Sequence, residues 1–166
     1  MIGVEGDGVY EPIQVYQRFN PNVSDAVFRI ESCFPGVNMS DNGNSTLLVI
    51  DDEPLIVRLI VRSFRDEFNE IIISTTPEEA EEKLQQHTIT HVICDAYLGP
   101  DTPHGISLIQ KWYAEVPSLK KAVLFTGRDL SSIPRVPGIE VISKNDDPVR
   151  LLNTLRTSLE APPAPY

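Results

Sequence analysis

The sequence is poor in cysteine, in basic residues and in long apolar runs. Its two cysteines, Cys33 and Cys94, are far apart in a chain of 166 residues, which favours a reduced, cytoplasmic protein. A single disulfide between them is the alternative. Lys and Arg number 14 against 24 Asp and Glu, a net charge of −10, which argues against nucleic-acid or anionic-membrane partners. No run of about 18 apolar residues and no signal-peptide layout is present, so we expect no membrane contact.

From residue 46 onward the chain alternates short apolar runs with helical patterns. Such alternation is typical of βα units in a parallel sheet. We predict strands over 46–50, 71–73, 91–94, 122–125 and 139–143, and helices that begin near Pro54, Pro77, Gly105 and Pro148. Pro134 and Pro137 leave little room for a full helix between the last two strands. The predicted fold class is therefore α/β, with a shortened fourth helix.

Residues 1–45 differ from the rest, because they are rich in Gly, Asn, Pro and Ser and show no sustained periodicity. We predict a poorly ordered N-terminal extension. The alternative is a segment that docks on a partner or on the domain's own surface. A short helix over 24–32 is its one local pattern, and Met39 is a candidate natural start. The domain proper spans 46–160, and the proline-rich tail 161–166 cannot extend the last helix.

Polar residues follow four of the predicted strands, at the point where each strand ends. Asp51 and Asp52 follow the first, Asp95 the third, Thr126 the fourth and Lys144 the fifth. Because the carboxyl ends of parallel strands lie along one edge of a sheet, these side chains should converge there. Three close carboxylates repel one another unless a cation lies among them, and oxygen ligands favour Mg²⁺ or Ca²⁺. The sequence therefore predicts a metal site.

Each of these features alone has a plainer interpretation. An Asp pair before a proline-started helix is often an N-cap, Thr126-Gly127 is more often a turn, and Lys144 alone is more often a solvated charge. Asp95 alone can cap a turn. Their coincidence at one sheet edge favours a joint site. The three histidines, His87, His91 and His104, lack metal-ligand spacing. Trp112 is expected in the core.

In order and spacing, these motifs resemble the receiver domain of bacterial two-component response regulators, over residues 46–160. The resemblance implies a doubly wound, five-stranded parallel sheet of flavodoxin-like order 2-1-3-4-5. It implies that Asp95 is the phosphoacceptor, a carboxylate nucleophile. Lys144 would pair with one phosphoryl oxygen as a point charge, and Thr126 would hydrogen-bond another.

The same resemblance implies a Mg²⁺ site. Asp52 would ligate the ion directly, Asp51 would do so through water or position the metal, and Asp95 and the backbone carbonyl of Tyr97 would complete the protein's ligands. Two rival site chemistries fit less well. A haloacid dehalogenase phosphatase needs Asp-x-Asp, which Asp51-Asp52-Glu53 does not supply. A flavodoxin-like nucleotide binder needs a hydroxyl- and glycine-rich loop where this chain has acids.

We therefore expect a stand-alone receiver, since the chain ends soon after the last predicted helix, and not a turnover enzyme. A sensor histidine kinase or phosphotransfer protein would supply the phosphoryl group, and an unknown downstream protein would read it. The alternative is a phosphorylation-independent pseudo-receiver that acts as an interaction module. Val141 stands where the family commonly has an aromatic residue and Asn145 where proline usually follows the lysine, so the departures concern how the signal leaves the domain.

Overall fold

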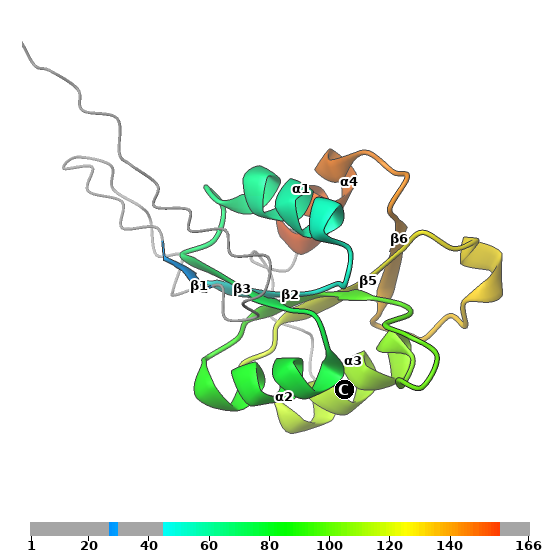
Figure 1. Ribbon diagram of the computed structural model, residues 1–166, viewed down its shortest axis with the longest axis horizontal. Helices are drawn as coiled ribbons and strands as arrows, with labels where there is room; N and C mark the ends of the chain where they lie inside the picture. The colour runs from blue at the N-terminus through cyan, green and yellow to red at the C-terminus, as the bar shows by residue number, and fades with distance from the viewer. Residues whose placement is uncertain (1–26, 30–44, 157–166) are drawn as a thin grey trace, which may run out of the picture.

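The computed structural model describes residues 27–29 and 45–156, and its centre is one sheet of six strands in the order β1-β3-β2-β4-β5-β6 (Figure 1). The strands are β1 (Val27–Arg29), β2 (Thr46–Ile50), β3 (Glu70–Ser74), β4 (His91–Asp95), β5 (Lys121–Thr126) and β6 (Glu140–Ser143). The last five are parallel. Numbered along the chain, those five have the order 2-1-3-4-5, so the predicted doubly wound fold is confirmed.

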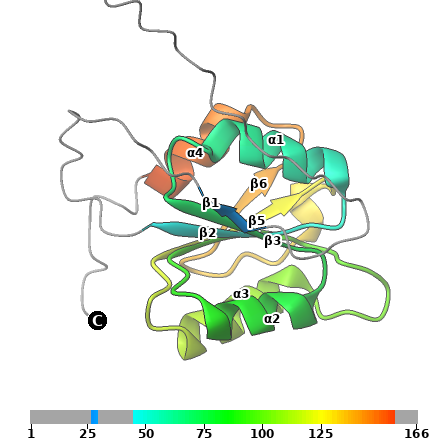
Figure 2. The same ribbon diagram turned by 60° about the vertical axis from the view of Figure 1, so that its left-hand side comes forward.

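Helices cover both faces of this sheet. They are α1 (Pro54–Phe64), α2 (Pro77–Gln86), α3 (Gly105–Glu115) and α4 (Pro148–Arg156). In two views α1 and α4 lie on one face, and α2 and α3 on the other (Figures 1 and 2). All residues of β2 and β4 are consequently buried, which explains why these strands read as continuous apolar runs. None of the described helices has the length and apolarity to cross a membrane.

Local sequence signals explain where the helices begin. Proline is the first residue of α1, α2 and α4, a position where its missing amide costs no hydrogen bond. Thr76 caps α2, since its Oγ1 accepts a hydrogen bond from the Glu79 amide at 3.2 Å. The inward face of α1 holds Val57, Ile60 and Phe64.

The predicted shortening of the fourth helix is also confirmed. Between β5 and β6 the chain forms a single 3-10 turn, η1 (Leu130–Ser132). Asp129 caps it by accepting a hydrogen bond from the Ser131 amide at 3.0 Å. Pro134 follows closely, and proline disfavours helical geometry in the residue before it. The segment from Gly127 to Gly138 therefore stays largely without regular structure.

Part of the N-terminal extension belongs to the sheet, and here the sequence prediction needs correction. A helix over 24–32 was the expected pattern, but Val27–Arg29 forms β1 and pairs antiparallel with β3, with Val27 opposite Ile72 and Arg29 opposite Glu70. The sheet thus has a sixth strand beyond the five predicted. The physical reason is the unpaired edge of β3, which can accept any extended segment. Residues 1–26 and 30–44, with Cys33 and Met39, and the tail 161–166 lie outside the described residues.

Candidate functional site

The structure brings the predicted site residues together at the carboxyl edge of the sheet. Asp51, Asp95, Thr126 and Lys144 stand at or just after the ends of β2, β4, β5 and β6. Asp51 and Thr126 are 1% exposed and Asp95 is 7% exposed, whereas Asp52 is exposed. Burial of two carboxylates at one edge is costly unless a cation or hydrogen bonds compensate them.

The acidic residues form a group that suits a divalent cation. One carboxylate oxygen from each of Asp51, Asp52 and Asp95 lies within 4.8 Å of the others. Asp51 Oδ1 accepts a hydrogen bond from the Glu53 amide at 2.9 Å, and the buried Asp51 Oδ2 lies 2.8 Å from the Lys144 ammonium. A group made only of carboxylates has the donor chemistry that hard cations such as Mg²⁺ prefer. The residues present therefore fit a metal.

Lys144 is the positive charge of the site. Its Nζ lies 2.8 Å from Asp51 Oδ2, 2.7 Å from Glu53 Oε1 and 3.0 Å from Asp95 Oδ2, and its side chain is only 6% exposed. Burial lowers the pKa of Lys144, but its contacts with the three carboxylates outweigh this and raise it overall. One ammonium thus compensates several acids at once. The part played by Glu53 was not predicted, although its place beside the Asp pair was a signal for it.

Burial controls the protonation of Asp51. It raises the pKa of Asp51 to about 6, against the opposing effects of Lys144 and of the Glu53 amide. The lysine therefore only partly offsets the cost of placing this carboxylate in the interior.

Backbone contacts hold the remaining site residues. The Lys144 amide donates to the Thr126 carbonyl at 2.7 Å, and Thr126 Oγ1 accepts a hydrogen bond from the Arg128 amide at 3.1 Å. The Tyr97 amide donates to Asp95 Oδ1 at 3.3 Å. The Thr126 hydroxyl and the Asp95 carboxylate are thus each held by a residue two positions further along. The metal-binding role of the Tyr97 carbonyl stays a prediction.

Gly105 is a site-supporting residue that the sequence prediction missed. A Cβ at this position would lie 2.1 Å from the backbone oxygen of Asp95 and 2.9 Å from a methyl carbon of Leu124. Only glycine therefore lets α3 begin so close to the end of β4. The sequence signal was the glycine at the start of the helix, but nothing in the sequence named the backbone that it approaches.

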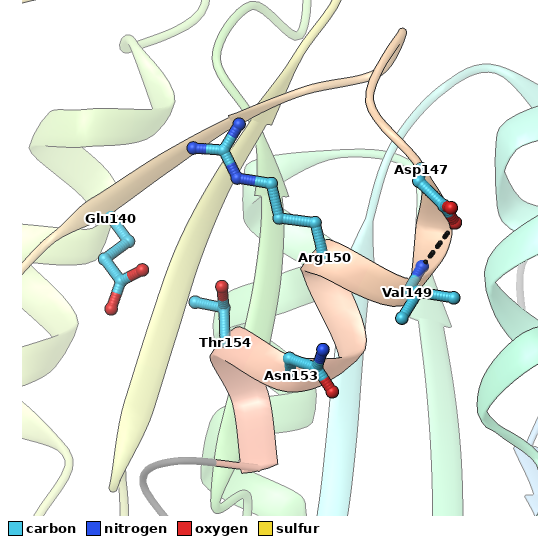
Figure 3. Close-up of a pocket in the computed structure, with 6 residues that line it drawn as sticks. All are labelled: Glu140, Asp147, Val149, Arg150, Asn153 and Thr154. Atoms are coloured by element: carbon cyan, nitrogen blue, oxygen red, sulfur yellow. Dashed lines mark hydrogen bonds between the residues drawn. The ribbon is translucent and has the colours of Figure 1, made fainter.

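A separate hollow of about 580 Å³ lies between β6 and α4, and Figure 3 shows its lining. The lining residues are Glu140, Asp147, Val149, Arg150, Asn153 and Thr154. Asp147 accepts a hydrogen bond from the Val149 amide at 2.9 Å, the dashed line in Figure 3, and Arg150 pairs with Asp146. These polar groups cap or brace α4. None of the predicted site residues lines this hollow.

The buried thiol of Cys94 and the buried imidazole of His91 lie outside the predicted site. Burial, followed by the charges of Asp95 and Asp51, raises the pKa of the Cys94 thiol, which is free in this structure. His91 is fully buried, and burial lowers its pKa to about 4. A neutral imidazole and an inert thiol follow, so neither group supplies a nucleophile at neutral pH.

No protein-family model matches the chain, and no curated relative does, but solved structures share its fold. The signal receiver domain of an HD domain-containing protein from Pseudomonas fluorescens Pf-5 is 24% identical, with a TM-score of 0.61 over 70% of this chain and 95% of that one. A CheY-like response regulator receiver domain protein from Methanospirillum hungatei JF-1 is 23% identical, with a TM-score of 0.58 over 70% and 94%.

A response regulator receiver protein from Sinorhizobium medicae WSM419 is similar at 20% identity, with a TM-score of 0.62 over 72% of this chain and 97% of that one. The chain therefore has the fold of response-regulator receiver domains, as the motifs indicated. The acidic group of Asp51, Asp52 and Asp95 is present on that fold.

Proposed function

We propose that this chain is a response-regulator receiver that accepts a phosphoryl group on Asp95 in a Mg²⁺-dependent reaction. The observation that carries the proposal is the convergence of Asp95 with two further acids and with Lys144, whose Nζ is 3.0 Å from Asp95 Oδ2. A buried carboxylate beside an ammonium is shielded from bulk water yet keeps a charge partner for an incoming anion.

In the proposed reaction a carboxylate oxygen of Asp95 attacks the phosphorus of a phosphohistidine or of a small acyl phosphate. A new phosphorus–oxygen bond forms, and the bond to the donor breaks with its electron pair leaving on the donor. Lys144 moves its ammonium from the carboxylates to a phosphoryl oxygen, and the Thr126 hydroxyl donates to another. Each group is within the buried edge described above, so no long-range closure is required.

The metal would be held by Asp51, Asp52 and Asp95, with the backbone carbonyl of Tyr97. When bound, Mg²⁺ supplies positive charge that offsets the repulsion between the acids and the phosphoryl oxygens. The carboxylate-only donor set of Asp51, Asp52 and Asp95 supports this assignment.

We further propose that the donor is a sensor histidine kinase or a phosphotransfer protein, that a downstream protein reads the phosphorylated form, and that the chain works in the cytoplasm. It would be a signalling domain that phosphorylates and dephosphorylates itself, not a turnover enzyme. The receiver fold supports these assignments by analogy.

Incubation with acetyl phosphate and Mg²⁺, followed by intact mass, tests the proposal. We expect one added phosphoryl group, none in Asp95→Asn, and none when a chelator removes the metal. Asp101→Asn is the matched control, because Asp101 is an exposed acid in the loop after β4, and it should label normally. Label that survives in Asp95→Asn, or no label on the wild type from any donor, would favour the pseudo-receiver alternative.

A further inference from the structure

A groove between α2 and α3 holds the chain's single tryptophan. Its volume is about 200 Å³, and none of the predicted site residues lines it. Trp112 is 1% exposed, and Leu84 and Val116 in the same lining are partly buried. The remaining lining residues are polar: Glu81, Gln85, Lys111 and Glu115. An aromatic ring with aliphatic neighbours and a polar rim is typical of grooves that bind extended, proline-rich chains.

The indole of Trp112 lacks a hydrogen-bond acceptor. Its Nε1 is buried and meets no acceptor among residues 27–29 and 45–156, although buried indole N–H groups usually find a partner. A carbonyl oxygen brought into the groove would satisfy this donor once the rim widens. The rim can yield, because the ion pair that joins α2 to α3, Lys111 Nζ to Glu81 Oε1 at 2.6 Å, has partners that are 45% and 38% exposed. Water replaces such a pair at little cost.

The segment that follows α4 has the complementary chemistry. Residues 161–166 contain three prolines, and Pro162 and Pro165 have the spacing of a Pro-x-x-Pro motif. Proline carries no amide donor, so such a segment offers carbonyl oxygens and has few donors to satisfy. In a polyproline II helix, which has about three residues per turn, Pro162 and Pro165 share one face. The segment thus matches a groove whose unmet need is an acceptor.

The topology starts this segment at the same edge of the sheet as the groove. α4 ends at Arg156, whose Nε donates to Glu67 Oε2 at 3.0 Å, and Glu67 lies between α1 and β3, at the amino edge. The groove lies at that edge too, because its lining comes from the last turns of α2 and α3.

The remaining distance is the thickness of the fold. Both α3 and α4 pack against β5, on opposite faces of the sheet (Figure 2). Two helix layers with a sheet between them lie roughly 20 Å apart. The ten residues 157–166 reach about 31 Å in polyproline II. They are therefore long enough to pass round the amino end of β5 and enter the groove.

We propose that residues 161–166 dock in the groove between α2 and α3 as a polyproline II segment, with a backbone carbonyl that accepts a hydrogen bond from Trp112 Nε1. The occupant is the chain's own tail, because the tether holds it at an effective concentration of about millimolar. A separate proline-rich partner binds there only by displacing it. The docking is independent of the proposed phosphorylation, since Asp95 lies at the opposite edge of the sheet.

The single tryptophan makes the test specific, because an isotope-labelled full chain gives one indole N–H signal in NMR spectra. Pro162→Ala/Pro165→Ala should shift this signal upfield and speed its exchange with water about fivefold, the factor that one net hydrogen bond corresponds to. Pro163→Ala is the matched control. It removes a proline of the same tail from a different face of the polyproline II helix, so the signal should stay as in the wild type.

A synthetic peptide of residues 157–166 tests the groove directly. Added at millimolar concentration to Pro162→Ala/Pro165→Ala, it should restore the wild-type indole signal. In that same background, Trp112→Phe keeps an aromatic ring but removes the N–H, and it should bind a fluorescent form of the peptide about fivefold more weakly. Circular dichroism checks that this variant is folded.

Three outcomes would overturn the proposal. The first is an indole signal that is the same in the wild type and in Pro162→Ala/Pro165→Ala. The second is a peptide that leaves the signal of that variant unmoved. The third is a wild-type signal that changes with protein concentration, because the groove would then hold the tail of a second copy.

Discussion

The two ends of the sheet both bury polar side chains, but they compensate them differently. At the amino ends of the strands, Thr90 and His91 are 5% and 0% exposed. Thr90 Oγ1 accepts a hydrogen bond from the Thr46 amide at 2.9 Å, contacts the Thr46 carbonyl at 3.0 Å and lies 2.8 Å from His91 Nδ1. These groups are neutral and partnered, as buried polar groups in folded proteins usually are.

At the carboxyl ends the compensation is incomplete. Three carboxylates, those of Asp51, Glu53 and Asp95, share the single ammonium of Lys144. Burial alone therefore does not distinguish a functional site from a structural polar cluster. What distinguishes them is charge left over after the local partners are counted, since that charge can be relieved by a ligand.

The largest expected effect comes from removing the shared ammonium. Lys144→Met leaves Asp51 and Asp95 buried without a cation, which should lower the free energy of unfolding by about 3–5 kcal/mol in metal-free buffer. Urea denaturation checks this. Lys121→Met is the control, because its partner Glu140 is about half exposed, so the loss should stay under about 1 kcal/mol. Equal losses in the two variants would mean that the buried carboxylates at the carboxyl end depend on Lys144 no more than the exposed Glu140 depends on Lys121.

The two ends should respond to pH in opposite directions. His91 has a folded pKa of about 4, below the unfolded value near 6.5, so its contribution to stability is lost as pH falls through that window. Asp51 has a folded pKa of about 6 against 3.8 unfolded, so its contribution is lost as pH rises from about 4 to about 6. Each shift corresponds to about 3 kcal/mol.

Variants separate these opposing contributions in metal-free buffer. Between pH 4 and pH 6.5, the stability of Asp51→Asn should rise with pH because His91 remains. The stability of His91→Gln should have a lower slope against pH than that of Asp51→Asn, because Asp51 remains. Denaturation at several pH values measures both slopes. Equal slopes would show that the two ends do not differ in the protonation that burial favours.

A metal should relieve the charge that remains at the carboxyl end. Mg²⁺ at about a hundred times its dissociation constant should stabilise the protein by about 2.7 kcal/mol, read as a rise in melting temperature. Asp52→Ala should remove most of this response. Asp101→Asn serves as the control, because Asp101 is an exposed acid outside the acidic group and its loss should leave the response in place. A melting temperature that ignores millimolar Mg²⁺ would mean that the three acids are not one site.

Much of the fold and of the site's membership could be predicted, because both depend on local patterns. The strand ends that carry Asp51, Asp95 and Thr126 are fixed by apolar runs, and parallel strands place those ends at one edge. The short turn η1 follows from Pro134 for the same local reason.

The failures involve pairing and packing between distant segments. The strand at Val27–Arg29 depends on the free edge of β3, which no pattern within residues 1–45 records. Gly105 is needed because of the Asp95 backbone oxygen, and that approach exists only in the folded chain. The apolar residues Leu55 and Leu59 of α1 are 76% and 41% exposed, because the neighbouring elements cover the face of Val57, Ile60 and Phe64 instead.

The same substitution at the two ends gives a smaller but sharper contrast. Thr90→Val leaves the buried Thr46 amide without its acceptor and should cost about 1–3 kcal/mol in unfolding, with labelling by acetyl phosphate unchanged. Thr126→Val should change labelling and its decay, because the hydroxyl that we assign to the phosphoryl group is removed. If Thr90→Val altered labelling as strongly as Thr126→Val, the amino end would also belong to the functional site.

The smallest effect should come from a region at neither end. β1 has three residues and pairs only with the edge of β3, whereas every predicted site residue lies after residue 50. A chain that begins at Met39 lacks β1, so it should lose about 1 kcal/mol or less, in line with the weakness of isolated short-strand pairing. It should keep the circular dichroism spectrum of a folded α/β domain and its labelling rate. An insoluble or unlabelled truncation would show that β1 secures β3, and through the hydrogen bond from the Asp51 amide to the Ser74 carbonyl at 3.2 Å, the acidic edge itself.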